Sequence, residues 1–255
     1  MAFNVNELII DRVRSIRAYD PENGEMKYRL SQIEEPSLSC TSEGEEVTDA
    51  VGSLITTLYR AKKATFSGTN SLFSLDLAAA QFGTDKESGA VTNYYANIIH
   101  VSKGTATIEL EKTPVENSLN TIYAVEGNGL STKFTAGEAA SETEFRIDGN
   151  VLTVPTDFEG QLFVDFAYEV EEGVRVVNMS DEFPKTVKLI ADVILRDPCN
   201  DNTVYAGTIL AERAKLTPES VEIALTSTGK HGFEYQLFKN YCDDKAALFE
   251  IIVSA

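Results

Sequence analysis

Residues 187–195 read VKLIADVIL. Side chains alternate between the two faces of an extended strand, so residues at every second position share one face. The apolar residues on that face are Val187, Leu189, Ala191, Val193 and Leu195. Ile190 and Ile194 make the opposite face partly apolar, which predicts a strand that is covered on both sides.

The same period of two recurs along much of the chain. Alternating apolar residues predict further strands within residues 106–110, 162–170, 221–225 and 231–237. Residues that tolerate a positive φ lie between such runs, and they predict hairpins at residues 21–24, 128–129 and 148–150. The sequence therefore predicts a mainly β fold.

Residues 71–83, SLFSLDLAAAQFG, have helical spacing instead. Ser71 is the expected N-cap and Gly83 the expected stop, so we predict one short α-helix here. Ahead of it, Gly52 weakens a helix and β-branched residues follow, which favours a loop and then a strand from about residue 54 to residue 66.

The composition is that of an ordinary globular protein, with 43% hydrophobic and 24% charged residues. The first residues lack a basic region before their short apolar run, and no stretch is long enough to span a bilayer. We therefore expect neither a signal peptide nor a membrane anchor. Three cysteines, Cys40, Cys199 and Cys242, are too few and too scattered for a disulfide framework and suit a reducing compartment.

The net charge of −18 is unevenly distributed. Residues 1–100 carry −5, residues 101–173 carry −10, and residues 174–255 carry −3. Phosphate binding depends on lysine and arginine, so a protein this acidic is not expected to bind nucleic acid tightly. The middle segment differs electrostatically from the rest and is predicted to be a separate acidic β-module.

Residues 231–244, HGFEYQLFKNYCDD, are the strongest candidate for a catalytic or metal site. They contain His231, Cys242, Asp243 and Asp244, but not the paired ligand spacing of structural zinc. Strand alternation places His231 on one face with three apolar residues, Phe233, Tyr235 and Leu237. The favoured interpretation is a strand that runs into a turn, with a Cys–His nucleophile pair as the less favoured alternative.

Other motifs also favour structural explanations. His100 is the second of two histidines, and neither lies in a recognisable catalytic string. The glycines at 127 and 129 are not followed by a helical pattern that could bind phosphate, and no EF-hand spacing supports calcium binding in the acidic segment. Adjacent acids at 34–35, 45–46 and 171–172 leave a glycosidase carboxylate pair open. We predict no catalytic, cofactor-binding or metal-binding residues.

The C-terminal run from residue 181 to residue 253 resembles the corresponding half of bacteriophage tail tube proteins. Its features are a long strand, a strand that enters a loop at Pro218, the strand SVEIALTS, the strand that begins HGFE, and a final apolar strand. AKKATFSGTNSLFSLDLAAAQFG, residues 61–83, resembles their strand and helix segment. The resemblance covers residues 1–100 and 174–255, which are expected to form a discontinuous tail-tube-like β-sandwich, whereas residues 101–173 are predicted to form an inserted Ig-like all-β module.

The resemblance implies a virion structural protein without catalysis or cofactor. Such subunits form stacked hexameric rings with other tail proteins, and genome DNA passes through the lumen without specific binding. Assembly would occur in the host cytoplasm, the product would be the virion tail, and no membrane would be involved. The wall would be expected to carry excess carboxylates. The alternatives are a capsid decoration or head-fibre protein, and a monomeric carbohydrate-binding or carbohydrate-active β-sandwich.

Overall fold

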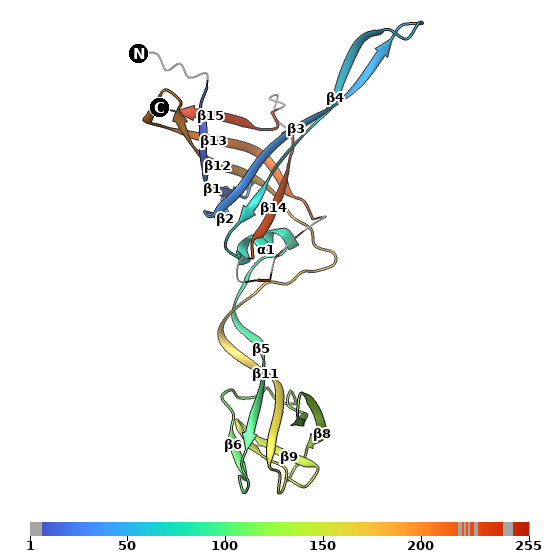
Figure 1. Cartoon of the computed structure of the whole chain (residues 1–255), viewed down its shortest axis with the longest axis vertical. Coiled ribbons are helices and arrows are strands. Elements are labelled where there is room, and N and C mark those ends of the chain that lie inside the picture. The colour runs from blue at the N-terminus through green and yellow to red at the C-terminus, as the bar shows by residue number, and fades with distance from the viewer. Residues whose placement is uncertain are drawn as a thin grey trace. The chain divides into compact units, whose positions relative to one another are not determined.

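A computed structural model describes residues 7–218, 221, 223, 225–226, 229–241 and 247–254. The chain forms two compact units, each with its own sheet and core (Figure 1). The first unit combines Met1–Lys86 with Val176–Ala255, and the second unit is Glu87–Arg175. The boundary expected after residue 100 falls inside a strand of the second unit, because the local pattern at residues 87–100 does not reveal its pairing partner.

The first unit is an eight-stranded sheet with one short helix. The strands follow the order β2-β1-β12-β13-β14-β4-β3, and β15 pairs with β13 beside this path. The elements are β1 (Ile9–Tyr19), β2 (Met26–Leu30), β3 (Ile33–Thr48), β4 (Leu54–Asn70), α1 (Leu75–Phe82), β12 (Thr186–Asp197), β13 (Asn200–Leu216), β14 (His231–Leu237) and β15 (Glu250–Ser254).

Strand β12 confirms the alternation in VKLIADVIL. Its five predicted core residues are all buried, while Ile190 and Ile194 on the other face are half-buried. Residues of β1, β4, β13 and β14 complete the core around them. Burial of alternate apolar residues on several paired strands is the main stabilising contribution to this unit.

Helix α1 begins three residues later than the sequence predicts. Ser74, not Ser71, is the N-cap, and its hydroxyl accepts the Leu77 backbone N–H at 3.2 Å. The Ser71 hydroxyl donates instead to the Glu34 carboxylate, which is distant in sequence. Gly83 ends the helix as predicted, with a φ of 79°. A side chain at Gly83 would collide with the backbone of Phe183, so the site requires glycine.

The loop expected before residue 54 is shorter than predicted. Strand β3 extends to Thr48, and the hairpin turn occupies residues 49–53. Most of the outer half of β3 is exposed, so its residues have no apolar alternation to identify a strand. Pairing with β4 supplies the backbone hydrogen bonds in the absence of a packed face. The predicted strand at 54–66 is confirmed, within the longer β4.

The second unit forms a seven-stranded sheet in the order β5-β11-β7-β8-β9-β10-β6. Its strands are β5 (Glu87–Val101), β6 (Thr107–Glu109), β7 (Thr121–Glu126), β8 (Gly129–Ala136), β9 (Glu144–Asp148), β10 (Val151–Thr153) and β11 (Gly160–Arg175). Glu87 is paired with Arg175, so the chain enters and leaves this unit through two adjacent strands.

The hairpins predicted from turn residues are confirmed in both units. Residues 20–25 join β1 to β2, residues 127–128 join β7 to β8, and residues 149–150 join β9 to β10. Of the strand predicted at residues 221–225, the structure describes Val221, Ile223 and Leu225, and none of these three lies in a strand. Ile223 is described, and it forms an isolated bridge with His231.

Candidate functional site

His231 is buried in β14, on the face predicted from the sequence. Phe233, Tyr235 and Leu237 share that face and are buried, whereas Glu234 and Gln236 are exposed. Cys242, Asp243 and Asp244 lie outside the described residues. The prediction that the stretch starts as a strand with His231 on its inner face is therefore confirmed.

The imidazole of His231 links β14 to helix α1. The Ser74 backbone N–H donates to Nδ1 at 3.3 Å, so the ring proton lies on Nε2 and is donated to Gln81 Oε1 at 2.7 Å. Gln81 Nε2 in turn donates to the Gly232 carbonyl at 2.8 Å. Burial lowers the pKa of His231, so the neutral ring is favoured. These contacts assign His231 a structural role.

The paired acids of the sequence are separate surface groups. Glu34 binds Lys230 at 2.6 Å, and this hydrogen bond lowers the pKa of Glu34 and raises the pKa of Lys230. Glu45 faces Arg60 at 3.3 Å. Among the described residues, no group of three or more His, Cys, Asp or Glu side chains could hold a metal ion. No helix within the described ranges is long and apolar enough to cross a bilayer.

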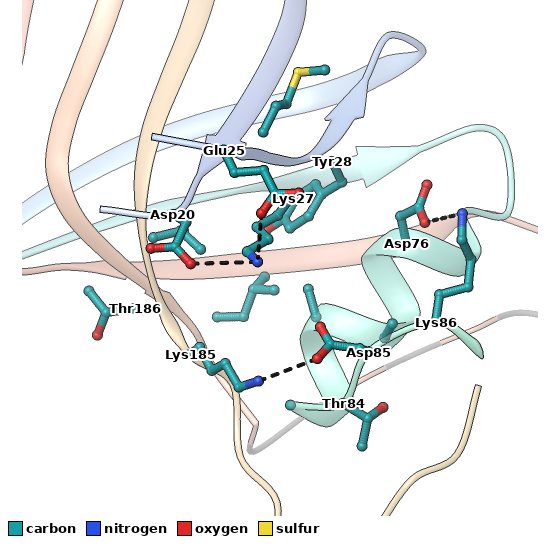
Figure 2. A pocket seen from close by; sticks show the side chains of 16 residues that line it. Asp20, Glu25, Lys27, Tyr28, Asp76, Thr84, Asp85, Lys86, Lys185 and Thr186 are labelled. Carbon is teal, nitrogen blue, oxygen red and sulfur yellow. Dashed lines mark ion pairs between the residues drawn. The ribbon is translucent and has the colours of Figure 1, made fainter. Parts of the chain in front are cut away.

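A cavity of about 250 Å³ lies beside α1 in the first unit (Figure 2). Lys27 lies 3.5 Å from Asp20 and 3.7 Å from Glu25 at one side of the rim. Backbone N–H groups, first that of Glu22, lower the pKa of Asp20. On the other side, Lys86 binds Asp76 at 2.6 Å and Lys185 lies 3.8 Å from Asp85.

The interior of this cavity is more apolar than its rim. Ala79, Ala80, Val187 and Leu216 contribute to its lining. Because each rim lysine already has a carboxylate partner, the cavity is better suited to a neutral group than to a charged ligand. Sequence reasoning missed the cavity, since its lining comes from segments that are remote from one another in the chain.

Two of the open sheet edges in the first unit carry exposed isoleucines. Within the described ranges, residues 9–12 of β1 pair with β12 alone and β15 pairs with β13 alone. Ile10 and Ile251 lie at these edges with exposed fractions of 69% and 62%. Open edges and exposed aliphatic side chains together are typical of an assembly surface.

The hairpin of β3 and β4 is a third exposed feature. Its outer part extends beyond the rest of the sheet, and α1 lies at the opposite end of β4 (Figure 1). The tip and its flanks carry Val51, Leu54, Ile55 and Tyr59, all exposed in the isolated subunit. Neither the extent of the hairpin nor its exposure follows from local sequence patterns.

The fold is that of a mainly β protein with open sheet edges and an exposed hairpin. The model of the YomU/Tube protein family matches residues 8–251, and the chain belongs to that family. A comparison with curated proteins found no match. Family membership confirms the resemblance to phage tail tube proteins and indicates a component of the virion tail.

Proposed function

We propose that the chain is a tail tube subunit that forms stacked hexameric rings around a lumen through which DNA passes. In this role it contacts copies of itself and other tail proteins, and it needs no catalytic residue or cofactor. Assembly takes place in the host cytoplasm. The observation that carries the proposal is the layer β1-β12-β13-β15, which has open edges at residues 9–12 of β1 and along β15.

Strand direction supports ring closure through this layer. Each neighbouring pair in β1-β12-β13-β15 is antiparallel, so β1 and β15 run in opposite directions. When β15 of one copy lies beside β1 of the next, the new pair is also antiparallel. Because each copy adds four strands, the alternation continues around a ring of any size, and the heterologous contact closes without a free edge.

Apolar burial supports the same joint. Ile10 is paired with Leu195, which is 7% exposed and faces the core. Ile251 is paired with Ile209, which packs against the core. Both exposed isoleucines therefore lie on the core face of the layer, where a neighbouring copy would extend the core. Covering them contributes about 1–2 kcal/mol each.

In the proposed ring, the other face of the layer lines the lumen. It carries paired charges, with Arg17 and Asp192 2.6 Å apart and Lys188 and Glu212 3.0 Å apart. Arg29, paired opposite Arg17, adds positive charge. This differs from the expected excess of carboxylates, because the net charge of the chain does not reveal which face each charge occupies. Internally compensated charges would still limit binding to phosphates.

Stacking of rings is assigned to the hairpin of β3 and β4. Strand β4 has 17 residues, which corresponds to a length of about 55 Å between the hairpin tip and α1. A projection at one end of the unit can contact the opposite end of the next unit, which gives a head-to-tail contact that repeats along a tube.

Two substitutions separate ring closure from stacking. Ile10→Asp places a charge in the proposed joint, and we expect monomers by light scattering after size exclusion, with no rings by negative-stain imaging. Val51→Asp at the hairpin tip, which is 88% exposed, should leave rings intact and prevent their stacking. Circular dichroism checks that both variants remain folded.

Several outcomes would contradict this proposal. Wild-type protein that stays monomeric at high concentration would contradict it, as would rings that persist in the Ile10→Asp variant. Threefold rings would support the capsid decoration or head-fibre alternative instead. Sugar binding or hydrolysis by a stable monomer would support the carbohydrate-binding or carbohydrate-active alternative.

A further inference from the structure

The second unit presents an apolar surface on the side of its sheet that faces away from its core. In β11, Leu162 and Val164 are fully buried, whereas Phe163 between them is half-buried and lies on the opposite face. Phe163 is neither a member of the core cluster of this unit nor packed against it. The outer face of β11 therefore starts a separate apolar surface.

Neighbouring strands extend this surface on both sides of β11. Phe163 is paired with Ile98 of β5 and with Tyr123 of β7, so the three side chains lie in one row. Val125 of β7 is paired with Leu130 of β8 in the next row. Directly opposite residues have Cβ atoms roughly 5 Å apart, which makes the rows contiguous. We call this surface the outer apolar patch; its members are Tyr94, Ile98, Tyr123, Val125, Leu130 and Phe163.

Half of this patch is strongly exposed. Tyr94, Ile98 and Leu130 have exposed fractions of 77%, 52% and 55%. Single exposed apolar residues are common on soluble proteins, but a contiguous set across four strands marks an interaction surface. An open sheet face that carries two tyrosines and a phenylalanine has the side chains that dominate protein interfaces.

The charge of the second unit indicates which kind of partner the outer apolar patch can bind. The second unit has 15 acidic and five basic residues, a net charge of −10. Asp165 and Glu169 lie on the same face as the patch, opposite Ala96 and Thr92, and one basic residue, Lys133, lies opposite Tyr123. Contact between two copies through this face would bring like charges together, which costs free energy. A partner with an apolar stripe flanked by lysine and arginine would have the opposite charge.

We propose that the outer apolar patch docks a basic, amphipathic polypeptide segment of another protein. The apolar stripe of that segment covers Ile98, Phe163 and Tyr123, and its basic residues approach Asp165 and Glu169. This interaction does not depend on ring formation, because the patch belongs entirely to the second unit. It gives the inserted unit a task that differs from that of the tube-forming sheet.

The test uses the full chain and a labelled synthetic peptide of leucine and lysine, with all leucines on one helical face. Binding is followed by fluorescence anisotropy at several salt concentrations. We expect binding that weakens as salt rises, since exposed charges are screened. A peptide with glutamate in place of lysine should bind far more weakly. Equal binding of the two peptides would refute the proposed partner chemistry.

Substitutions locate the binding to the patch. The double variant Tyr94→Ser, Ile98→Ser should lose about tenfold in affinity, because less apolar area is covered. Val151→Ser in β10 removes an exposed apolar side chain elsewhere in the same unit, with an exposed fraction of 38%, and should bind as the wild type does. Asp165→Asn should reduce the salt dependence.

Other occupants of the patch would appear as distinct results. If the wild type self-associates in light scattering and the double variant does not, a second copy of the chain covers the patch and the proposal is wrong. If neutral oligosaccharides bind through Tyr94 and Ile98 while the lysine peptide does not, the partner is a carbohydrate. Unchanged peptide affinity in the double variant, or an equal loss in Val151→Ser, would also overturn the proposal.

Discussion

The hydroxyl groups of Tyr28 and Tyr235 form a buried pair that can be tested by a double-mutant cycle. They lie 2.7 Å apart and join β2 to β14, which are not neighbours in the sheet. Both phenols are fully buried in the core, and burial raises the pKa of each well above its usual range. The perturbation is replacement by phenylalanine, singly and together.

The expected magnitudes follow from hydrogen-bond satisfaction. Tyr28→Phe or Tyr235→Phe leaves one hydroxyl buried without its partner, which costs about 1–3 kcal/mol of the free energy of unfolding. Replacing both removes the two polar groups together, so the double variant should lie within about 1 kcal/mol of the wild type. In a chain of this length each kcal/mol corresponds to a shift of about 2–4 °C in Tm.

The assay is equilibrium unfolding in urea, followed by far-ultraviolet circular dichroism at one fixed protein concentration. Tyr59→Phe in the hairpin is the control, because Tyr59 is 74% exposed and its removal should change stability by less than about 0.5 kcal/mol. The reasoning would be refuted if the double variant lost as much free energy of unfolding as the two single variants together. The two hydroxyls would then contribute independently of each other.

Two further predictions concern helix α1 and its surroundings. Because burial lowers the pKa of His231, the unfolded chain binds a proton more readily than the folded chain below about pH 6.5. The free energy of unfolding, measured by urea titration, should therefore fall as the pH drops from neutral toward 5.5. The variant His231→Gln should lose this pH dependence, whereas the control variant His100→Gln should keep it. Gly83→Ala should destabilise the first unit by about 1–3 kcal/mol through its positive φ and more through collision with Phe183. Gly24→Ala has a similar φ of +74° but no atom within 4 Å of the added carbon, so calorimetry should find a smaller loss, and equal losses would contradict the collision.

Local patterns in the sequence predicted the strands that have one packed face. The alternation in β12, β11 and β14 marks buried residues directly, because the side-chain period of a strand is two. Turn residues located the hairpins, and Gly83 located the end of the helix. These features depend on neighbouring residues in the chain, so they are visible without tertiary structure.

Features that depend on distant residues could not be predicted in this way. Most of the outer half of β3 is exposed, so only its pairing with β4 identifies it as a strand. The hydrogen-bond partners of the His231 imidazole are more than a hundred residues away, at Ser74 and Gln81. The Ser71 hydroxyl donates a hydrogen bond to Glu34, and Ser74 is the N-cap of the helix.

Membership of a tube family was within reach of the sequence, because the order of its strands and turns carries the resemblance. The candidate interaction surfaces could not be predicted from the sequence. Alternation assigns the side chains of a strand to two faces but does not say which face is covered or which edge lacks a neighbour. Those properties belong to the whole sheet, and so the tertiary structure alone decided that Ile10, Ile251 and the patch residues Tyr94, Ile98 and Leu130 are exposed.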